Sequence, residues 1–143
     1  SRMDGIQASI LSVKLQYIKE WTALRQKNAK LYDDLFSSIH HVIEPSVDDR
    51  AEHVYHLYVI RTSNRDSLIN YLKDKNISTG IHYPTPLPFL KAYDYLNHNR
   101  DHFPVVSEQQ EQILSIPMFP ELSEQEIEYV VKSIRQFSWA YII

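Results

Sequence analysis

A stretch without proline, from Asp4 to Phe36, constrains the fold of this chain more than any other part of its sequence. Apolar side chains recur along it mostly at steps of three and four residues, the spacing of one face of an α-helix. The members of this stripe are Ile6, Ile10, Val13, Tyr17, Trp21, Leu24, Ala29, Tyr32 and Phe36. A helix of about 30 residues would be about 45 Å long, which exceeds the width of a domain of this size. We therefore expect this helix, capped by Asp4 or Ser1, to break near Glu20 to Thr22 or to project from the remaining chain.

Composition excludes several classes of function. The 143 residues allow one domain, or one domain and an arm, with one sizeable core. A net charge of -3 argues against binding nucleic acid through bulk positive charge. Two glycines, Gly5 and Gly80, are too few for a glycine-rich phosphate loop, and the absence of cysteine removes thiol nucleophiles, disulfides and thiolate-bound metals. No apolar run is long enough to span a membrane, so we expect a cytoplasmic protein.

Two strands and a helix are predicted in the middle of the chain. The segment from His53 to Arg61 is rich in β-branched and aromatic residues, which favours a strand. Asn64 can cap a helix over residues 65–75, and residues 77–82 follow as a second strand. An extended stretch is also expected from Val42 to Pro45.

The C-terminal half alternates loops with short helices. Prolines make residues 83–88 an ordered extended loop, residues 89–96 resemble a short helix, and residues 97–102 an exposed turn. Ser107 can cap a helix that carries Ile113 and Leu114. The capping-box pattern that begins at Ser123 predicts the start of a last helix.

The seven histidines do not predict a metal site. Six of them form sequence pairs, namely His40 with His41, His53 with His56, and His98 with His102. Alternation along a strand sends the second pair to opposite faces, and the third lies in a polar turn. Because ligation needs three or four convergent donors, we expect hydrogen-bonded or solvated histidines and no native metal.

One constellation is left that could bind a ligand, the segment from Gly80 to Pro86. A strand end delivers the imidazole of His82 and the phenol of Tyr83 into a rigid proline loop, where both could hydrogen-bond a polyhydroxylated or phosphorylated ligand. In the alternative interpretation Tyr83 packs and His82 bonds a backbone carbonyl. The residues alone leave both open.

Four segments together resemble the DegT/DnrJ/StrS sugar aminotransferases, and they follow the order and spacing of that family. They are residues 1–8 (SRMDGIQA), 53–61 (HVYHLYVIR), 80–86 (GIHYPTP) and 114–118 (LSIPM). The resemblance covers only the C-terminal part of such a protein. It implies an α/β fold, here the α+β small domain of a fold-type-I aminotransferase, with a small, mostly antiparallel sheet packed with helices and a long N-terminal helix before it. Residues 1–37 would be an arm on a missing large domain, and residues 38–143 the small domain.

The resemblance also implies a cofactor, pyridoxal phosphate, and a distribution of roles. In this family the Schiff-base lysine and the other catalytic residues lie in the large domain, so we expect no catalytic residue here. This chain alone is expected to be inactive and to bind no cofactor. Arg2 matches an arginine near the dimer-shared active site, where it could hold the cofactor phosphate or a donor carboxylate. His82 and Tyr83 match a loop at the sugar-nucleotide entrance, although Pro88 stands where relatives have a second histidine.

The sequence therefore predicts part of an enzyme that transfers an amino group from an amino acid, with glutamate as the expected donor, to a nucleotide-linked keto-deoxysugar. The expected partners are those two substrates, the large domain and a second copy in a homodimer. The alternative is a non-catalytic binding or oligomerisation module, favoured by the apolar stripe and by the apolar tail from Phe137 to Ile143.

Overall fold

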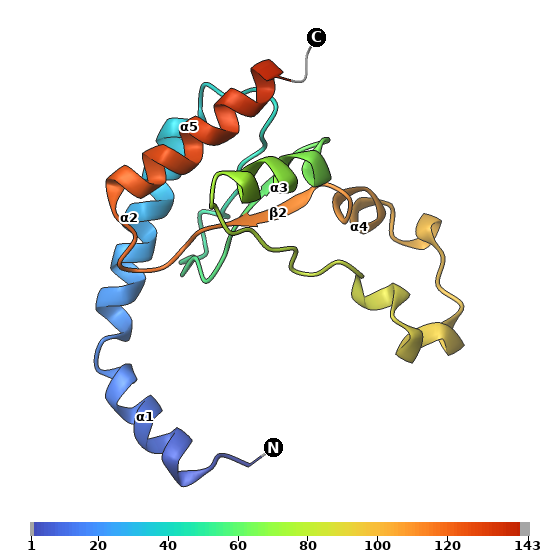
Figure 1. Cartoon of the computed structure of the whole chain (residues 1–143). Coiled ribbons are helices and arrows are strands. Elements are labelled where there is room, and N and C mark those ends of the chain that lie inside the picture. Colours follow the sequence, from blue (N-terminus) through green and yellow to red (C-terminus); the bar gives the residue numbers. More distant parts are fainter. Residues whose placement is uncertain (1, 141–143) are drawn as a thin grey trace.

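The computed structural model describes residues 2–140 and leaves the side chains of residues 138–140 undescribed. Ser1, one of the two predicted caps, and the end of the apolar tail, 141–143, lie outside the described residues. Figure 1 shows an arch: helices α2, α3 and α5 and the strands form its body, and the chain extends from the body in two directions, as α1 and as the segment that includes α4.

The N-terminal helical region is two helices, α1 (Gly5–Leu15) and α2 (Ile18–Phe36). The predicted break near residues 20–22 is wrong, because it lies at Gln16 and Tyr17. There the backbone makes tighter bonds, from Gln16 N to Val13 O at 3.2 Å and from Tyr17 N to Lys14 O at 3.1 Å. Residues 20–22 are helical: Trp21 N donates to Tyr17 O at 2.9 Å, and the Trp21 ring stacks on that of Tyr17, with centroids 5.8 Å apart.

Helix α1 is capped as predicted but has no cover in the described part of the chain. Asp4 accepts a hydrogen bond from Ile6 N at 2.8 Å, and Gln7 completes a capping box by accepting from Asp4 N at 3.4 Å. No residue of α1 is buried.

The body has a small antiparallel sheet, as the fold prediction stated. Strand β1 (Tyr58–Arg61) pairs with β2 (Ile113–Ile116), with Tyr58 opposite Ile116 and Arg61 opposite Ile113. Single bridges extend it on either side, from Ile43 to Arg61 and from Gly80 to Ser115.

The core lies between this sheet, the C-terminal half of α2, α3 (Arg65–Asp74) and α5 (Glu124–Ala140). Its buried side chains are Ala29, Tyr32, Phe36, Ile39, Val42, Tyr58, Ile60, Leu68, Leu72, Ile77, Leu114, Ile116, Leu122, Ile127, Val130, Val131, Ile134 and Phe137. The capping box predicted for α5 is confirmed: Glu126 accepts from Ser123 N at 2.8 Å, and Ser123 Oγ accepts from Glu126 N at 3.3 Å.

The predicted strand from His53 to Arg61 is too long, since only its last four residues pair. Tyr55 has a positive φ of 46°, which turns the chain out of an extended path. Arg25 of α2 fixes this turn, because its guanidinium donates to the carbonyls of Tyr55 and His56, both at 3.4 Å, and of Met118 at 3.1 Å. The segment therefore bonds to a helix side chain instead of a strand.

The predicted helix after Ser107 is also wrong. Helix α4 (Pro104–Gln109) begins at a proline, a residue suited to the first helical turn, and Ser107 lies inside it. The apolar run that includes Leu114 forms strand β2, because pairing with β1 buries it in the core.

Two smaller corrections concern residues 64–82. Asn64 stands at the start of α3, but its side chain makes no capping bond, since its φ of -105° and ψ of 38° are not the extended angles of a helix cap. The strand predicted over residues 77–82 is reduced to the single bridge at Gly80.

Residues 83–110, which we call the outer lobe, leave the body between Gly80 and β2. After the proline loop come three 3-10 turns, η1 (Leu87–Phe89), η2 (Lys91–Leu96) and η3 (Arg100–His102), and then α4. The predicted helix over residues 89–96 is therefore a pair of 3-10 turns, and the predicted turn over 97–102 contains a third. No residue of the outer lobe is buried.

No helix among residues 2–140 combines the length and the apolar character needed to cross a membrane.

Candidate functional site

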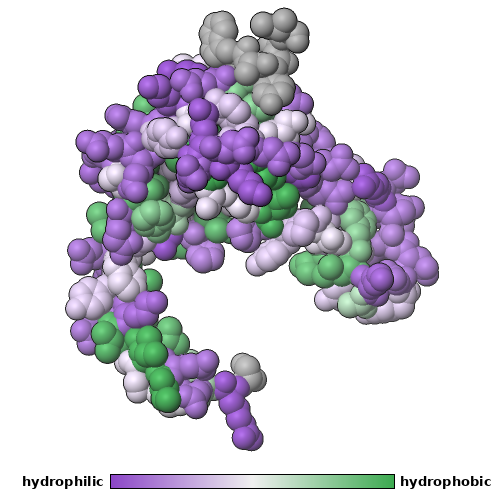
Figure 2. Space-filling view, viewed as in Figure 1, coloured by the Kyte–Doolittle hydropathy of each residue, from purple (hydrophilic) through white to green (hydrophobic). Residues whose placement is uncertain are grey.

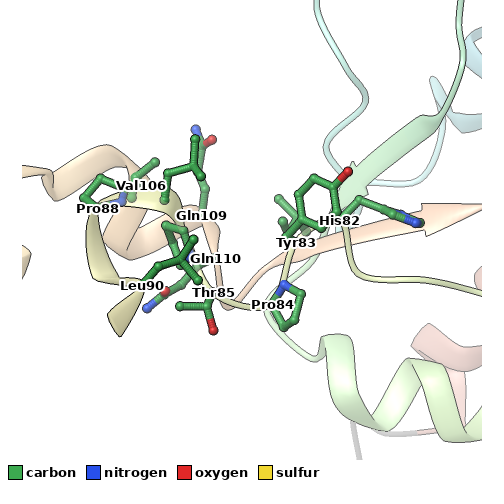
Figure 3. Close-up of a pocket in the computed structure, with 12 residues that line it drawn as sticks. His82, Tyr83, Pro84, Thr85, Pro88, Leu90, Val106, Gln109 and Gln110 are labelled. Atoms are coloured by element: carbon green, nitrogen blue, oxygen red, sulfur yellow. The ribbon is translucent and has the colours of Figure 1, made fainter. Parts of the chain in front are cut away.

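A pocket of about 710 Å³ lies where the proline loop faces α4. Its lining comes from the loop, from α4 and from the start of β2: His82, Tyr83, Pro84, Thr85, Pro86, Leu87, Pro88, Leu90, Val106, Gln109, Gln110 and Ile113. Figure 3 shows His82, Tyr83 and Pro84 on one side of this space and Pro88, Val106 and Gln109 on the other. The site therefore joins the edge of the body to the outer lobe.

His82 is held at the edge of the sheet. Gly80 pairs with Ser115 through two backbone hydrogen bonds, at 2.7 and 3.0 Å, and so brings the chain alongside β2. Two residues later, His82 Nδ1 lies 2.9 Å from Ser115 Oγ. His82 therefore bonds a hydroxyl, whereas the alternative interpretation expected a backbone carbonyl.

Tyr83 lies beside His82 and exposes most of its ring. Its exposed fraction is 73%, and its ring meets the imidazole edge-on, with centroids 5.8 Å apart. The structure brings these two predicted ligand-binding residues into one pocket. The alternative interpretation, in which Tyr83 packs, does not hold, because most of its ring is exposed.

Arg2, the third predicted site residue, is elsewhere. It lines a separate depression at the start of α1, together with Met3, Gln7, Ile10 and Leu11. Within the described residues, Arg2 is therefore not part of the pocket that His82 and Tyr83 share.

The pocket is mainly apolar, with hydrogen-bonding groups at a few places. Thr85, Gln109 and Gln110 add an hydroxyl and two amides to the imidazole and the phenol. Such a surface can pack against an apolar face of a ligand and bind its oxygen atoms.

The pocket does not by itself fit pyridoxal phosphate, the cofactor implied by the sequence resemblance. Its lining residues include no lysine to form a Schiff base and no arginine to neutralise a phosphate. The lining of this pocket therefore supplies neither the covalent anchor nor the phosphate partner that the cofactor needs.

The histidines do not form a cluster of metal ligands among residues 2–140. His98 and His102 have ring centroids 6.1 Å apart, and both belong to the exposed outer lobe.

The largest pKa shifts among the described residues belong to two tyrosines of the core and not to residues of the pocket. Burial raises the pKa of Tyr58, and its hydroxyl donates to the carboxylate of Asp33. Burial likewise raises the pKa of Tyr32, whose hydroxyl donates to Pro117 O at 2.9 Å. These phenols join α2 to the sheet and are not available to a ligand.

Sequence reasoning missed the part of the site that comes from distant residues. Ser115, Val106 and Gln109 lie beyond the outer lobe's turns in the chain, yet they contact His82 or line its pocket. A strand assignment for residues 113–116 would have pointed to Ser115, since alternation places its side chain on the opposite face of the sheet from those of Leu114 and Ile116.

Comparison with known proteins gives a consistent result. Residues 1–135 match the profile of the DegT/DnrJ/EryC1/StrS aminotransferase family. A "Pleiotropic regulatory protein" of Geobacillus stearothermophilus is 38% identical over 139 residues, covering 96% of this chain and 37% of its own length. The dTDP-3-amino-3,6-dideoxy-alpha-D-galactopyranose transaminase of Aneurinibacillus thermoaerophilus is 34% identical over 140 residues, covering 97% of this chain and 38% of its own length.

The fold agrees with these matches. The crystal structure of S. venezuelae DesV in complex with a ketimine intermediate superposes with a TM-score of 0.88 at 28% identity, over 99% of this chain and 38% of that one. The chain thus spans little more than a third of the length of the relatives it matches. From its profile match over residues 1–135, this chain belongs to the DegT/DnrJ/EryC1/StrS aminotransferase family.

Proposed function

We propose that this chain is the C-terminal part of a pyridoxal-phosphate-dependent sugar aminotransferase. The enzyme would transfer an amino group from glutamate to a nucleotide-linked keto-deoxysugar. The observation that carries the proposal is the unbroken match of residues 1–135 to the family, supported by a relative named as a dTDP-amino-sugar transaminase.

In this proposal the described residues form one wall of the substrate site. His82 and Tyr83 would bind oxygen atoms of the sugar nucleotide at the pocket, whose apolar loop is kept rigid by three prolines. The catalytic lysine would come from the preceding large domain, and this chain alone would be inactive and bind no cofactor.

Arg2 would serve a different part of the assembled enzyme, because it lies on another surface from His82. A guanidinium at that position could bind the cofactor phosphate or the carboxylate of the amino donor at an active site shared between two copies. The full-length enzyme would be a homodimer in the cytoplasm.

Helix α1 would be the contact to the large domain, within an arm of residues 1–37 beside a small domain of residues 38–143. Ile6, Ile10 and Val13 expose 74%, 55% and 58% of their surface. Figure 2 shows hydrophobic residues gathered on this helix. The remaining two thirds of a family member's length, which this chain does not span, would supply a cover for this surface.

The proposal is tested by assaying the full-length protein that contains this chain with L-glutamate and a set of dTDP- and UDP-linked keto sugars. We expect 2-oxoglutarate and an aminated sugar nucleotide in equal amounts, and none from residues 1–143 alone. Absence of transfer with every sugar, or turnover by the short chain alone, would contradict the proposal.

The exposed apolar surface of α1 also favours a second function, a non-catalytic binding or oligomerisation module. In that case residues 1–143 would associate without the large domain, and the substitution Ile10→Asp would dissociate them. Light scattering separates the two: a monodisperse monomer at all concentrations argues against the module.

A further inference from the structure

Ser115 is a buried hydroxyl that lies behind the pocket and not in its lining. The residue is only 4% exposed, and it sits in β2 opposite Val59 of β1. On its other side, its backbone N–H and C=O bond to Gly80 at 2.7 and 3.0 Å. Because it is paired with a neighbour on each side, its place along the sheet is fixed.

The imidazole of His82 lies over Gly80, in space that any other residue there would fill. A Cβ atom added to Gly80 would be 2.7 Å from His82 Cε1. Gly80 has no positive φ, so this position needs glycine for space and not for backbone conformation. The ring thereby reaches Ser115 Oγ with its Nδ1 atom at 2.9 Å.

The direction of this hydrogen bond follows from counting protons. Buried hydroxyl groups donate their single proton to a partner. Within the described part of the chain, Ser115 Oγ makes its hydrogen bond with His82 Nδ1. If Nδ1 carried the imidazole proton, the buried hydroxyl proton would have no acceptor there. If Nδ1 is bare, it accepts that proton and the buried hydroxyl is satisfied.

We propose that Ser115 is a positioning residue that donates to Nδ1 and holds neutral His82 in the tautomer protonated at Nε2. The imidazole atom left to donate to a ligand is then Nε2–H, on a ring whose centroid lies 5.8 Å from that of the exposed Tyr83 ring. Such a donor selects an oxygen acceptor, either on the sugar or on the diphosphate of a nucleotide sugar. The identity of that ligand rests on the proposed function, whereas the tautomer does not.

The tautomer is tested by nitrogen-15 NMR of the histidine-labelled protein, with the His82 signals assigned by their loss in His82→Gln. We expect an unprotonated, hydrogen-bonded Nδ1 and a protonated Nε2. A protonated Nδ1 in the unliganded neutral ring would overturn the proposal.

Variants separate positioning from simple stability. Ser115→Ala should give averaged nitrogen shifts, because both tautomers become accessible. Gly80→Ala should also give averaged nitrogen shifts, because the added methyl group displaces the His82 ring while the Ser115 hydroxyl is kept. This variant serves in place of Ser115→Ala if Ser115→Ala fails to fold. Ser115→Thr should retain the fixed tautomer. Ser133→Ala, which removes another buried serine hydroxyl, 2% exposed in α5, should leave the His82 signals unchanged. Equal shifts in Ser133→Ala and Ser115→Ala would refute a specific role.

Ligand binding identifies the acceptor. Ser115→Ala should weaken nucleotide-sugar binding about 2- to 10-fold, the range of one hydrogen bond, and raise KM more than it lowers kcat. If dTDP alone is weakened equally, the acceptor is a diphosphate oxygen; if only the nucleotide sugar is weakened, it is a sugar oxygen. A fixed tautomer with unchanged binding of both would retain Ser115 as a positioning residue and reject the assignment of His82 to the substrate.

Discussion

The two ends of the N-terminal apolar stripe have the same sequence pattern and opposite environments. In α1, Ile6 and Ile10 are 74% and 55% exposed, whereas in α2 Tyr32 and Phe36 are 0% and 1% exposed. The difference is that α5 and the sheet cover the end of α2, and no described residue covers α1. A helical pattern therefore identifies a face that needs cover, and the tertiary structure decides whether this chain provides it.

The largest effect is expected from truncating the covered end of the stripe. Tyr32 contacts the rings of Phe36 and Tyr58 at centroid distances of 5.9 and 4.9 Å and donates to Pro117 O. Tyr32→Ala should lower the free energy of unfolding by about 3–5 kcal/mol. Urea unfolding measures it against Tyr17→Ala, the same change at a residue 47% exposed, which should lose less than about 1 kcal/mol. Equal losses would abolish the distinction between the two ends.

A smaller loss is expected at Arg25, between the two ends. Its guanidinium binds the carbonyls of Tyr55, His56 and Met118. Arg25→Ala should cost about 1.5–3 kcal/mol, the value of hydrogen bonds from a charged donor. Arg50→Ala is the control, since that side chain is 90% exposed and bonds Asp48, two residues away in the same turn. If the two variants unfold at the same urea concentration, this part of α2 is not coupled to the sheet.

The two capping boxes allow the same comparison between a covered and an uncovered helix, with a smaller expected change in the free energy of unfolding. Ser123→Ala should destabilise the whole fold by about 1 kcal/mol, because α5 is part of the core. Asp4→Ala should leave global unfolding unchanged and increase amide exchange within α1, which buries nothing in the described chain. Global destabilisation by Asp4→Ala would show that α1 is covered after all.

The smallest effect is expected from His41, where only the direction is predicted. Burial lowers the pKa of His41 below its usual 6.5, so the unfolded chain binds a proton more readily than the folded one. Its contribution to stability is present above pH 6.5 and is lost as the pH falls through the lower pKa of the folded state. His41→Gln should flatten this part of the stability profile relative to His40→Gln, an exposed neighbour. Parallel profiles for both variants would contradict a burial effect.

Much of the fold could be predicted where local signals agree. The capping patterns at Asp4 and Ser123 mark helix starts correctly, because a cap is made by residues two or three positions apart. Leu114 was assigned to a helix because a short apolar run does not distinguish a strand from a helix. Its partner Ile60 lies far away in the chain, so no local pattern contains their pairing.

The candidate site also has some features that nearby residues determine and others that depend on distant segments. His82 and Tyr83 could be chosen as ligand-binding residues because proline rigidity and side-chain chemistry are local properties. Ser115 could not, because the hydrogen bond to His82 exists only after the bridge at Gly80 brings two separate segments together. Pocket residues on α4 were missed for the same reason.

The sequence by itself determined the helix caps at Asp4 and Ser123, the apolar faces and the proline loop, since each depends on residues within one or two turns of one another. It also carried the family resemblance that the comparisons confirm. Only the tertiary structure decided which apolar face is buried, where the first helix breaks and which hydroxyl meets His82. Those outcomes depend on packing between distant segments, whose free energy is not contained in any short stretch of the chain.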